Sequence, residues 1–194
     1  EIAGSERIVS DLLDSVRTKP PLPEAVDFAQ LIGQTLGKCS VPASVSVKLD
    51  IPATIFPMQV DPQQIHQVFR NLISNGIEAM PQGGTLQISA VADEAAKKII
   101  VSVRDSGVGM TAEQLGKLFQ PLFTTKPRGI GLGLVVVKNL TQANGGTVAA
   151  QSEVGLGTTF TVTLPTDDVG RASARHVGLK PDLQTLPSAE ERGI

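Results

Sequence analysis

The spacing of apolar residues along the chain alternates between periods of about 3.6 and about 2 residues, which predict helices and strands respectively. Residues 1–17 show the helical period, with charged side chains between the apolar ones. KPPLP (residues 19–23) then ends this helix and forms a stiff linker. Further helices are predicted over residues 27–36, 62–80, 112–119 and 132–143. Strands are predicted over residues 44–51, 55–60, 85–92, 98–104, 147–153 and 158–165.

The longest predicted helix within this pattern has the clearest boundaries. Asp61 followed by Pro62 is a typical start, because aspartate caps free N–H groups and proline is tolerated at the first helical position. PQGG (residues 81–84) ends the helix. After residue 165 the pattern dissolves, so residues 166–194 are predicted to be a disordered tail or linker. The apolar face of the long helix is predicted to consist of Ile65, Val68, Phe69, Leu72 and Ile73.

Composition and charge limit the class of protein. Of the 194 residues, 41% are hydrophobic and 3% are aromatic, which predicts an aliphatic core. The net charge of −2 gives no overall attraction to nucleic acid, and we expect no nucleic-acid partner. The single cysteine, Cys39, excludes an internal disulfide and favours a reducing compartment. We therefore expect a cytoplasmic location. Because the chain opens within a predicted helix and not at a methionine, we also expect a fragment of a longer protein, which can itself be membrane-anchored.

Two asparagines in the long helix are the first candidates for chemistry. Asn71 and Asn75 are four residues apart, so their amides lie on one helix face roughly 6 Å apart. A solvated polar stripe opposite the core face is one explanation, and the pair alone favours it. The other explanation is a hard-cation site, because an amide oxygen suits Mg²⁺, which takes its remaining ligands from waters and substrate phosphates.

The segment VRDSGVGM (residues 103–110) follows a predicted strand and contains Asp105, Gly107 and Gly109. With Ala112 the glycines also match a dinucleotide-binding fingerprint, but that fingerprint needs an acidic residue roughly 20 positions on, where this chain is basic and glycine-rich. A buried aspartate here can accept a hydrogen bond from an exocyclic amine such as that of adenine, and the glycines let a flat ring approach the backbone. A turn that closes the strand is the structural alternative.

The stretch FTTKPRGIGLGL (residues 123–134) places Lys126 ahead of three glycines at alternate positions. It matches neither the P-loop nor the dinucleotide loop. Gly133 begins a predicted helix, whose free N–H groups and dipole make an anion site. Gly129 and Gly131 keep side chains away from this site, and Lys126 adds a mobile positive charge. A surface loop with hinge glycines is the alternative.

A last glycine-rich segment, SEVGLGTTF (residues 152–160), joins the two final strands, and a hairpin turn explains most of it. Each motif has a structural explanation of its own, but their combination in this order is hard to reach by accident. Together they resemble the ATP-binding catalytic domain of the sensor histidine kinases, within the wider superfamily of gyrase, MutL and histidine-kinase ATPases. The resemblance covers about residues 26–165. The short lid, FQPLFTTKPRGIGLGL, resembles the nitrogen-regulation type.

This resemblance implies an α+β fold: a two-layer α/β sandwich of the Bergerat type, in which helices cover one face of a mixed sheet. EIAGSERIVSDLLDSVR at the start of the chain is similar to the second helix of the family's dimerisation and phosphoacceptor hairpin. The implied division of the chain is hairpin helix (residues 1–18), linker (19–25), ATP-binding catalytic domain (26–165) and tail (166–194).

The resemblance also implies roles for individual residues. Asn75 would ligate Mg²⁺, Asn71 would support the metal and the phosphates, and Lys126 would reach the phosphates; these three are the expected catalytic residues. Asp105 would bind the adenine amine, and Thr158 would help close the adenine pocket. The other expected nucleotide contacts are Gly107 and Gly109 in the base pocket, Phe119, Phe123 and Thr125 in the lid and its anchor, and Gly129, Gly131, Leu132 and Gly133 in the second glycine box.

One position distinguishes a kinase from a hydrolase. The hydrolytic ATPases of the superfamily carry a glutamate four residues before the metal-binding asparagine, and it serves as general base for water. Asn71 stands there in this chain, and a neutral amide cannot take a proton. The resemblance therefore implies a protein-histidine kinase that binds ATP and Mg²⁺ and transfers the γ-phosphoryl group. A hydrolytic ATPase and a nucleotide-binding pseudokinase scaffold are the alternatives.

The acceptor histidine of such a kinase is not recognisable in this chain. Its two histidines are His66, in the long helix, and His176, in the predicted tail, and neither lies in a stretch that resembles the phosphoacceptor motif. We expect the acceptor on the first helix of the hairpin, before residue 1. The expected partners are this hairpin, a second copy in a homodimer of the full-length protein, and the receiver domain of a response regulator.

Overall fold

Most predicted elements appear in the computed structural model, which describes residues 19–52, 57–126 and 129–166. The helix predicted over residues 1–17 lies outside these ranges, as does the predicted tail apart from Thr166, so both stay predictions. The helices are α2 (Phe28–Gly37), α3 (Pro62–Glu78), α4 (Ala112–Lys117) and α5 (Gly133–Ala143). The strands are β1 (Glu24–Val26), β2 (Val45–Asp50), β3 (Met58–Val60), β4 (Gly84–Asp93), β5 (Lys98–Asp105), β6 (Thr147–Glu153) and β7 (Gly157–Pro165).

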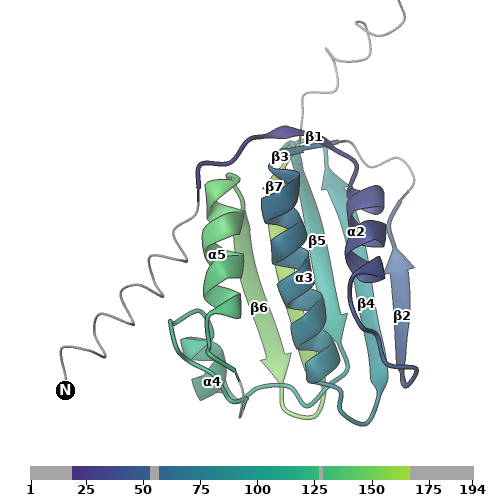
Figure 1. The fold of residues 1–194 in the computed structure, drawn as a ribbon, viewed down its shortest axis with the longest axis vertical. Coiled ribbons are helices and arrows are strands. Elements are labelled where there is room, and N and C mark those ends of the chain that lie inside the picture. The colour runs from purple at the N-terminus through teal and green to yellow at the C-terminus, as the bar shows by residue number, and fades with distance from the viewer. Residues whose placement is uncertain (1–18, 53–56, 127–128, 167–194) are drawn as a thin grey trace, which may run out of the picture.

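Five of these strands form a mixed sheet in the order β2-β4-β5-β7-β6. β2 and β4 run parallel, and the other neighbouring pairs are antiparallel. Helices α2, α3 and α5 lie side by side on one face of this sheet (Figure 1). The mixed sheet with helices on one face confirms the fold class that the resemblance implied.

An aliphatic core fills the space between the helix layer and the sheet. α3 lies in the middle of the helix layer (Figure 1), and all five residues predicted for its apolar face are buried. The ring of Phe69 meets that of Phe28 edge to face, with centroids 5.4 Å apart. The sheet contributes alternate residues, as period-2 strands with one buried face must. Those of the two central strands are Leu86, Ile88 and Ala90 of β4 and Ile99, Val101 and Val103 of β5.

The strand register brings distant parts of the sequence together at one end of the sheet. Asp105 is the last residue of β5 and lies opposite Leu86 of β4 and Thr158 of β7. The end of α3 and the start of α5 lie at the same end of the sheet (Figure 1). The motifs that the sequence analysis treated separately are therefore neighbours in space.

Asp61 connects three segments at the opposite end. Its carboxylate accepts from the backbone N–H groups of Gln63 and Gln64, at 3.0 Å each, which confirms the predicted cap of α3. It also accepts from the N–H of Leu22, at 3.0 Å, in the proline-rich segment. The N–H of Asp61 donates to Asn144 Oδ1, at 2.7 Å, at the end of α5. One aspartate thus starts α3 and holds the segment that enters the domain.

The short strand β1 was not predicted. Glu24–Val26 pairs antiparallel with β3, at a place where the sequence analysis expected a linker and the start of the domain. β3 itself begins at Met58, whereas a strand was predicted from residue 55, and residues 53–56 are outside the described ranges. A three-residue strand beside prolines has little local propensity, and pairing with a distant partner creates it. Within the described ranges, no helix has the length and apolar character to cross a bilayer.

Removing the cap at Asp61 tests this account of α3. Asp61→Ala should lower the free energy of unfolding by about 1–2 kcal/mol, because two N–H groups of α3 and that of Leu22 lose their acceptor. Asp61→Asn should cost only roughly a few tenths of a kcal/mol, since its amide oxygen can still accept. Urea unfolding followed by circular dichroism measures both, and equal losses would show that the acceptor geometry is not what matters.

Candidate functional site

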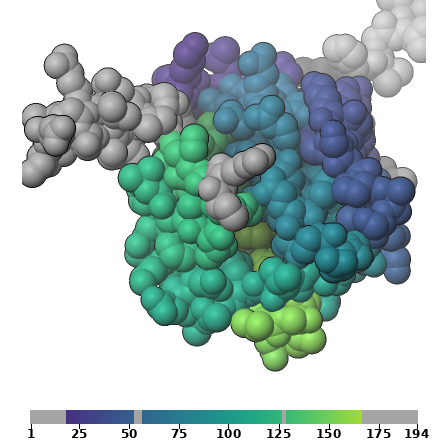
Figure 2. All heavy atoms as spheres, turned by 60° about the horizontal axis from the view of Figure 1, so that its bottom comes forward, coloured from purple at the N-terminus to yellow at the C-terminus, as the bar shows by residue number. Residues whose placement is uncertain are grey.

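A cavity of about 670 Å³ opens at the end of the sheet where β5 ends and β7 begins. Figure 2 shows it as a hollow between α3, in blue, and the green segment around the start of α5, with the yellow-green β7 at its floor. Eleven of the fourteen predicted site residues line this cavity. They are Asn75, Asp105, Gly109, Phe123, Thr125, Lys126, Gly129, Gly131, Leu132, Gly133 and Thr158.

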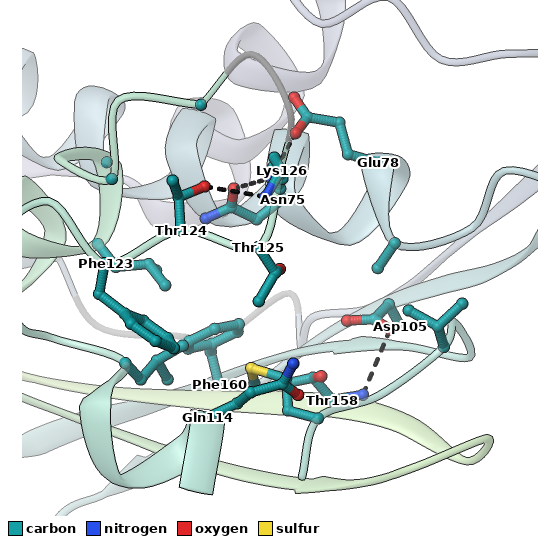
Figure 3. A pocket seen from close by; sticks show the side chains of 18 of the residues that line it. Asn75, Glu78, Asp105, Gln114, Phe123, Thr124, Thr125, Lys126, Thr158 and Phe160 are labelled. Atoms are coloured by element: carbon teal, nitrogen blue, oxygen red, sulfur yellow. Dashed lines mark hydrogen bonds and ion pairs between the residues drawn. The ribbon is translucent and has the colours of Figure 1, made fainter.

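Asp105 is a buried carboxylate in the wall of the cavity, with only 3% of the residue exposed. Its Oδ1 accepts from the backbone N–H groups of Gly107, at 2.9 Å, and Thr158, at 3.3 Å. Burial raises the pKa of this carboxyl above its ordinary value, and the two N–H donors partly oppose the rise because they favour the charged form. Both bonds end on Oδ1, so Oδ2 can accept from a donor in the cavity (Figure 3).

The two glycines after Asp105 are required by contacts between backbones. A Cβ on Gly107 would lie 2.3 Å from the carbonyl oxygen of Ala79, just beyond the end of α3. A Cβ on Gly109, whose φ is +66°, would lie 1.9 Å from the carbonyl oxygen of Glu153. The family resemblance implied that both glycines lie in the base pocket. Gly109 lines the cavity, whereas Gly107 does not and instead lets the loop pack against α3.

The glycines before α5 shape the backbone that leads into this helix. Gly131, at φ +74°, packs so closely on the preceding segment that a Cβ would lie 2.7 Å from the carbonyl oxygen of Phe123. Gly133 starts α5, and the residue at its N-cap, Leu132, forms no side-chain capping bond. The first N–H groups of α5, at residues that line the cavity, therefore have no side-chain acceptor at the N-cap and suit an anion.

Asn75 and Lys126 form the polar end of the cavity opposite Asp105 (Figure 3). Lys126 Nζ donates to Asn75 Oδ1, at 2.7 Å, and forms an ion pair with Glu78. In the ranges that the structure describes, no group of three or more His, Cys, Asp or Glu side chains can hold a metal. The oxygens around the Lys126 ammonium nevertheless fit a hard cation that takes most of its ligands from waters and phosphates.

Asn71 and Phe119 do not line the cavity. Asn71 Nδ2 donates to the carbonyl oxygen of Gly133, at 3.3 Å, so this asparagine links α3 to the start of α5. Phe119 packs against the core, and the Lys138 ammonium lies 6.0 Å from its ring centroid. Both residues hold the cavity together, and their predicted roles toward a ligand stay predictions.

Several cavity residues were missed by the sequence analysis. Glu78 was detectable in principle, because it is three residues after Asn75 and therefore on the same face of α3. Phe160 was detectable too, since it alternates with Thr158 on the same face of β7. The others depend on how loops fold over the cavity, which no local pattern specifies. They are Ala79, Val108, Met110, Gln114, Leu118, Thr124, Ile130 and Leu134.

Comparison with known protein families and curated proteins gives matches over most of the described domain. Residues 60–168 match the family described as histidine kinase-, DNA gyrase B-, and HSP90-like ATPases. The chain is 40% identical over 162 residues to the sensor histidine kinase ZraS of Escherichia coli (strain K12). That alignment covers 82% of this chain and 34% of ZraS, so the chain spans about a third of this curated relative.

Solved structures of similar fold include ShkA and the histidine kinase ThkA. Full-length ShkA in complex with AMPPNP superposes with a TM-score of 0.70 at 22% identity, over 84% of this chain and 37% of ShkA. The histidine kinase ThkA in complex with the response regulator protein TrrA superposes with a TM-score of 0.67 at 24% identity, over 88% of this chain and 49% of ThkA. At these identities the likeness concerns the fold.

The buried charge of Asp105 should be visible in the stability of the ligand-free chain. Because its pKa is raised in the folded state, ionising this carboxyl lowers stability as the pH rises through the folded-state pKa. Asp105→Asn should therefore raise the free energy of unfolding near pH 7, and the gain should shrink as the pH falls toward about 4. Urea unfolding across this range measures it.

The matched control is Asp50→Asn, at an exposed position at the end of β2. It should give no comparable gain, because no buried charge is removed. A gain for Asp105→Asn that did not change with pH would contradict the role assigned to ionisation.

Proposed function

The chain belongs to the family of histidine kinase-, DNA gyrase B-, and HSP90-like ATPases, as an ATP-binding catalytic domain of the sensor histidine kinase type. From this premise we propose that its cavity holds Mg-ATP for phosphoryl transfer to a histidine. The observation that carries the proposal is the division of the cavity into two chemically different ends. A buried carboxylate, Asp105, lies at one end, and Asn75 and Lys126 lie at the other.

The Asp105 end suits adenine. Its Oδ2 would accept from the exocyclic amine of the base, while the N–H groups of Gly107 and Thr158 hold Oδ1 in place. Guanine carries a carbonyl oxygen where adenine carries this amine, and two facing acceptors repel. A site built around one buried polar group rejects a ligand that leaves that group unpaired. Apolar side chains in the walls, among them Met110 and Phe160, would cover the faces of the ring.

The opposite end suits a triphosphate. The free N–H groups at the start of α5 would bind phosphate oxygens, and Lys126 would neutralise part of their charge. Asn75 would hold Mg²⁺ through its amide oxygen. A bound Mg²⁺ would supply charge neutralisation and orientation of the phosphates, on which phosphoryl transfer mainly depends. Asn71 would keep α3 and α5 at the distance that the phosphates need, through its bond to Gly133.

The nucleophile in this proposal is a histidine and not water. Asn71 is an amide, so the position of the general base in hydrolytic relatives holds no base. One observation favours the hydrolytic alternative: Glu78 places a carboxylate in the cavity wall, where it could serve as a general base for water. It is, however, engaged by Lys126 and lies after Asn75 rather than before it. We therefore infer that the chain presents ATP and hydrolyses it slowly.

The partners in the proposal follow from the direction of transfer. The acceptor histidine would lie on the first helix of a dimerisation hairpin, whose second helix would be residues 1–18, and the full-length protein would be a homodimer. The phosphoryl group would then pass to an aspartate of a response regulator receiver domain. ThkA, which shares the fold, has been solved with the response regulator TrrA, and this supports the second partner.

A phosphotransfer assay tests the function directly. The chain is mixed with the separately produced phosphoacceptor hairpin of the parent protein and γ-labelled ATP. Wild type should form acid-labile phosphohistidine on the hairpin, and Asn75→Ala should lower the rate by at least about a hundredfold, because metal and phosphates lose a ligand. Asn139→Ala, on α5 and outside the cavity, is the matched control and should retain activity.

Two other results would favour the alternatives. Tight Mg-ATP binding without any label on the hairpin would indicate a pseudokinase scaffold. Rapid ATP turnover by the chain alone, lost in Glu78→Gln, would indicate a hydrolase.

A further inference from the structure

The ammonium of Lys126 lies between two side-chain oxygens of α3. It donates to Asn75 Oδ1, at 2.7 Å, and forms an ion pair with the carboxylate of Glu78 (Figure 3). Asn75 and Glu78 are three residues apart, so both side chains project from the same side of the helix, and both line the cavity. The structure therefore contains a pair of oxygens that binds a cation, with the protein's own cation in place.

The same pair of oxygens suits a divalent ion. Amide and carboxylate oxygens are hard donors, which Mg²⁺ binds together with waters and phosphate oxygens. A lysine ammonium is a compact point charge, unlike the planar guanidinium of arginine. A metal ion can therefore take its place while the oxygens of Asn75 and Glu78 keep their positions. The side chains of Lys126 and Glu78 are 40% and 55% exposed, and an ion pair so open to water is weak. Lys126 can therefore leave.

We propose that Lys126 and a divalent cation compete for the oxygens of Asn75 and Glu78, and that Glu78 becomes a second protein ligand of the metal once Lys126 has left. The proposal rests on the proposed function in one respect, namely that the metal arrives with ATP. Glu78 then acts in two states, holding the lysine before the nucleotide binds and the metal afterwards. The binding of Mg-ATP would break the ion pair of Lys126 and bring the phosphates into the cavity together. The released Lys126 can then contact these phosphates.

Mn²⁺ alone tests the competition without any nucleotide. The readout is paramagnetic broadening of backbone amide resonances at residues 76–79 in the isotopically labelled full chain, at roughly millimolar Mn²⁺. Lys126→Met should broaden these resonances several-fold more than wild type, because the oxygen pair is then open. The double variant Lys126→Met/Glu78→Gln should return to the wild-type level. The spectra themselves report whether each variant is folded.

A matched control is available on α4, where Glu113 and Lys117 form an exposed ion pair at 2.8 Å. Lys117→Met opens that pair and should add no broadening at residues 76–79. Equal broadening in wild type and Lys126→Met would overturn the proposal, and so would broadening that persists in the double variant.

The affinity for ATP, measured by calorimetry with Mg²⁺ and with a chelator, tests the role of Glu78 when nucleotide is present. The factor by which Mg²⁺ strengthens ATP binding should fall roughly five- to tenfold in Glu78→Gln. The metal in Mg-ATP then loses a protein ligand. Metal-free ATP, in contrast, no longer meets a repelling carboxylate and can contact a Lys126 that is not paired with Glu78. Glu113→Gln should keep the wild-type factor. An unchanged factor in Glu78→Gln would contradict this role, whereas a wild type that binds no ATP would refute the proposed function and leave the Mn²⁺ result standing.

Discussion

The buried carboxylate of Asp105 is the constraint around which the rest of the site is arranged. Taking an ionised group out of water is costly unless donors compensate it. The β5–β7 register supplies one donor, the N–H of Thr158, and the turn after β5 supplies another, the N–H of Gly107. Gly76 lets α3 pack closely on this end of the sheet, since a Cβ there would lie 2.8 Å from Cδ1 of Leu86, the β4 partner of Asp105. The compensation is incomplete, as the raised pKa of Asp105 shows, and a ligand that donates to Oδ2 would complete it.

The two ends of the cavity differ in rigidity in a way that matches a nucleotide. The Asp105 end is made of strand backbone and core residues, so under the proposed function it would discriminate between bases. The other end contains the Lys126–Glu78 ion pair, which is partly exposed to water. α3 contributes to both the core and the cavity. One face of the helix is buried in the core, and Asn75 and Glu78 near its end line the cavity. In the proposed function, base specificity thus comes from the Asp105 end, and the cation is exchanged at the Lys126 end.

Much of the fold could be predicted from the sequence because its signals were local, whereas most of the candidate site residues came from the order of the motifs and the family that they resemble. Asp61-Pro62 marked the start of α3, and alternating apolar residues marked the central strands. What was missed depends on distant partners. β1 exists only through pairing with β3, and Gly107 is required by the carbonyl oxygen of Ala79, 28 positions earlier along the chain (107 − 79). The position of Glu78 on the same helix face as Asn75 was detectable, but its ion pair was not, because its partner Lys126 is 48 positions away.

The central claim, that Asp105 recognises adenine, is tested most directly by calorimetric titration of wild type and Asp105→Asn with Mg-ATP and Mg-GTP. Wild type should prefer ATP. In Asp105→Asn the preference should fall by about tenfold or more, because a charge-assisted hydrogen bond to the adenine amine is lost and the new amide can donate to guanine. An equal loss of affinity for both nucleotides would contradict the account.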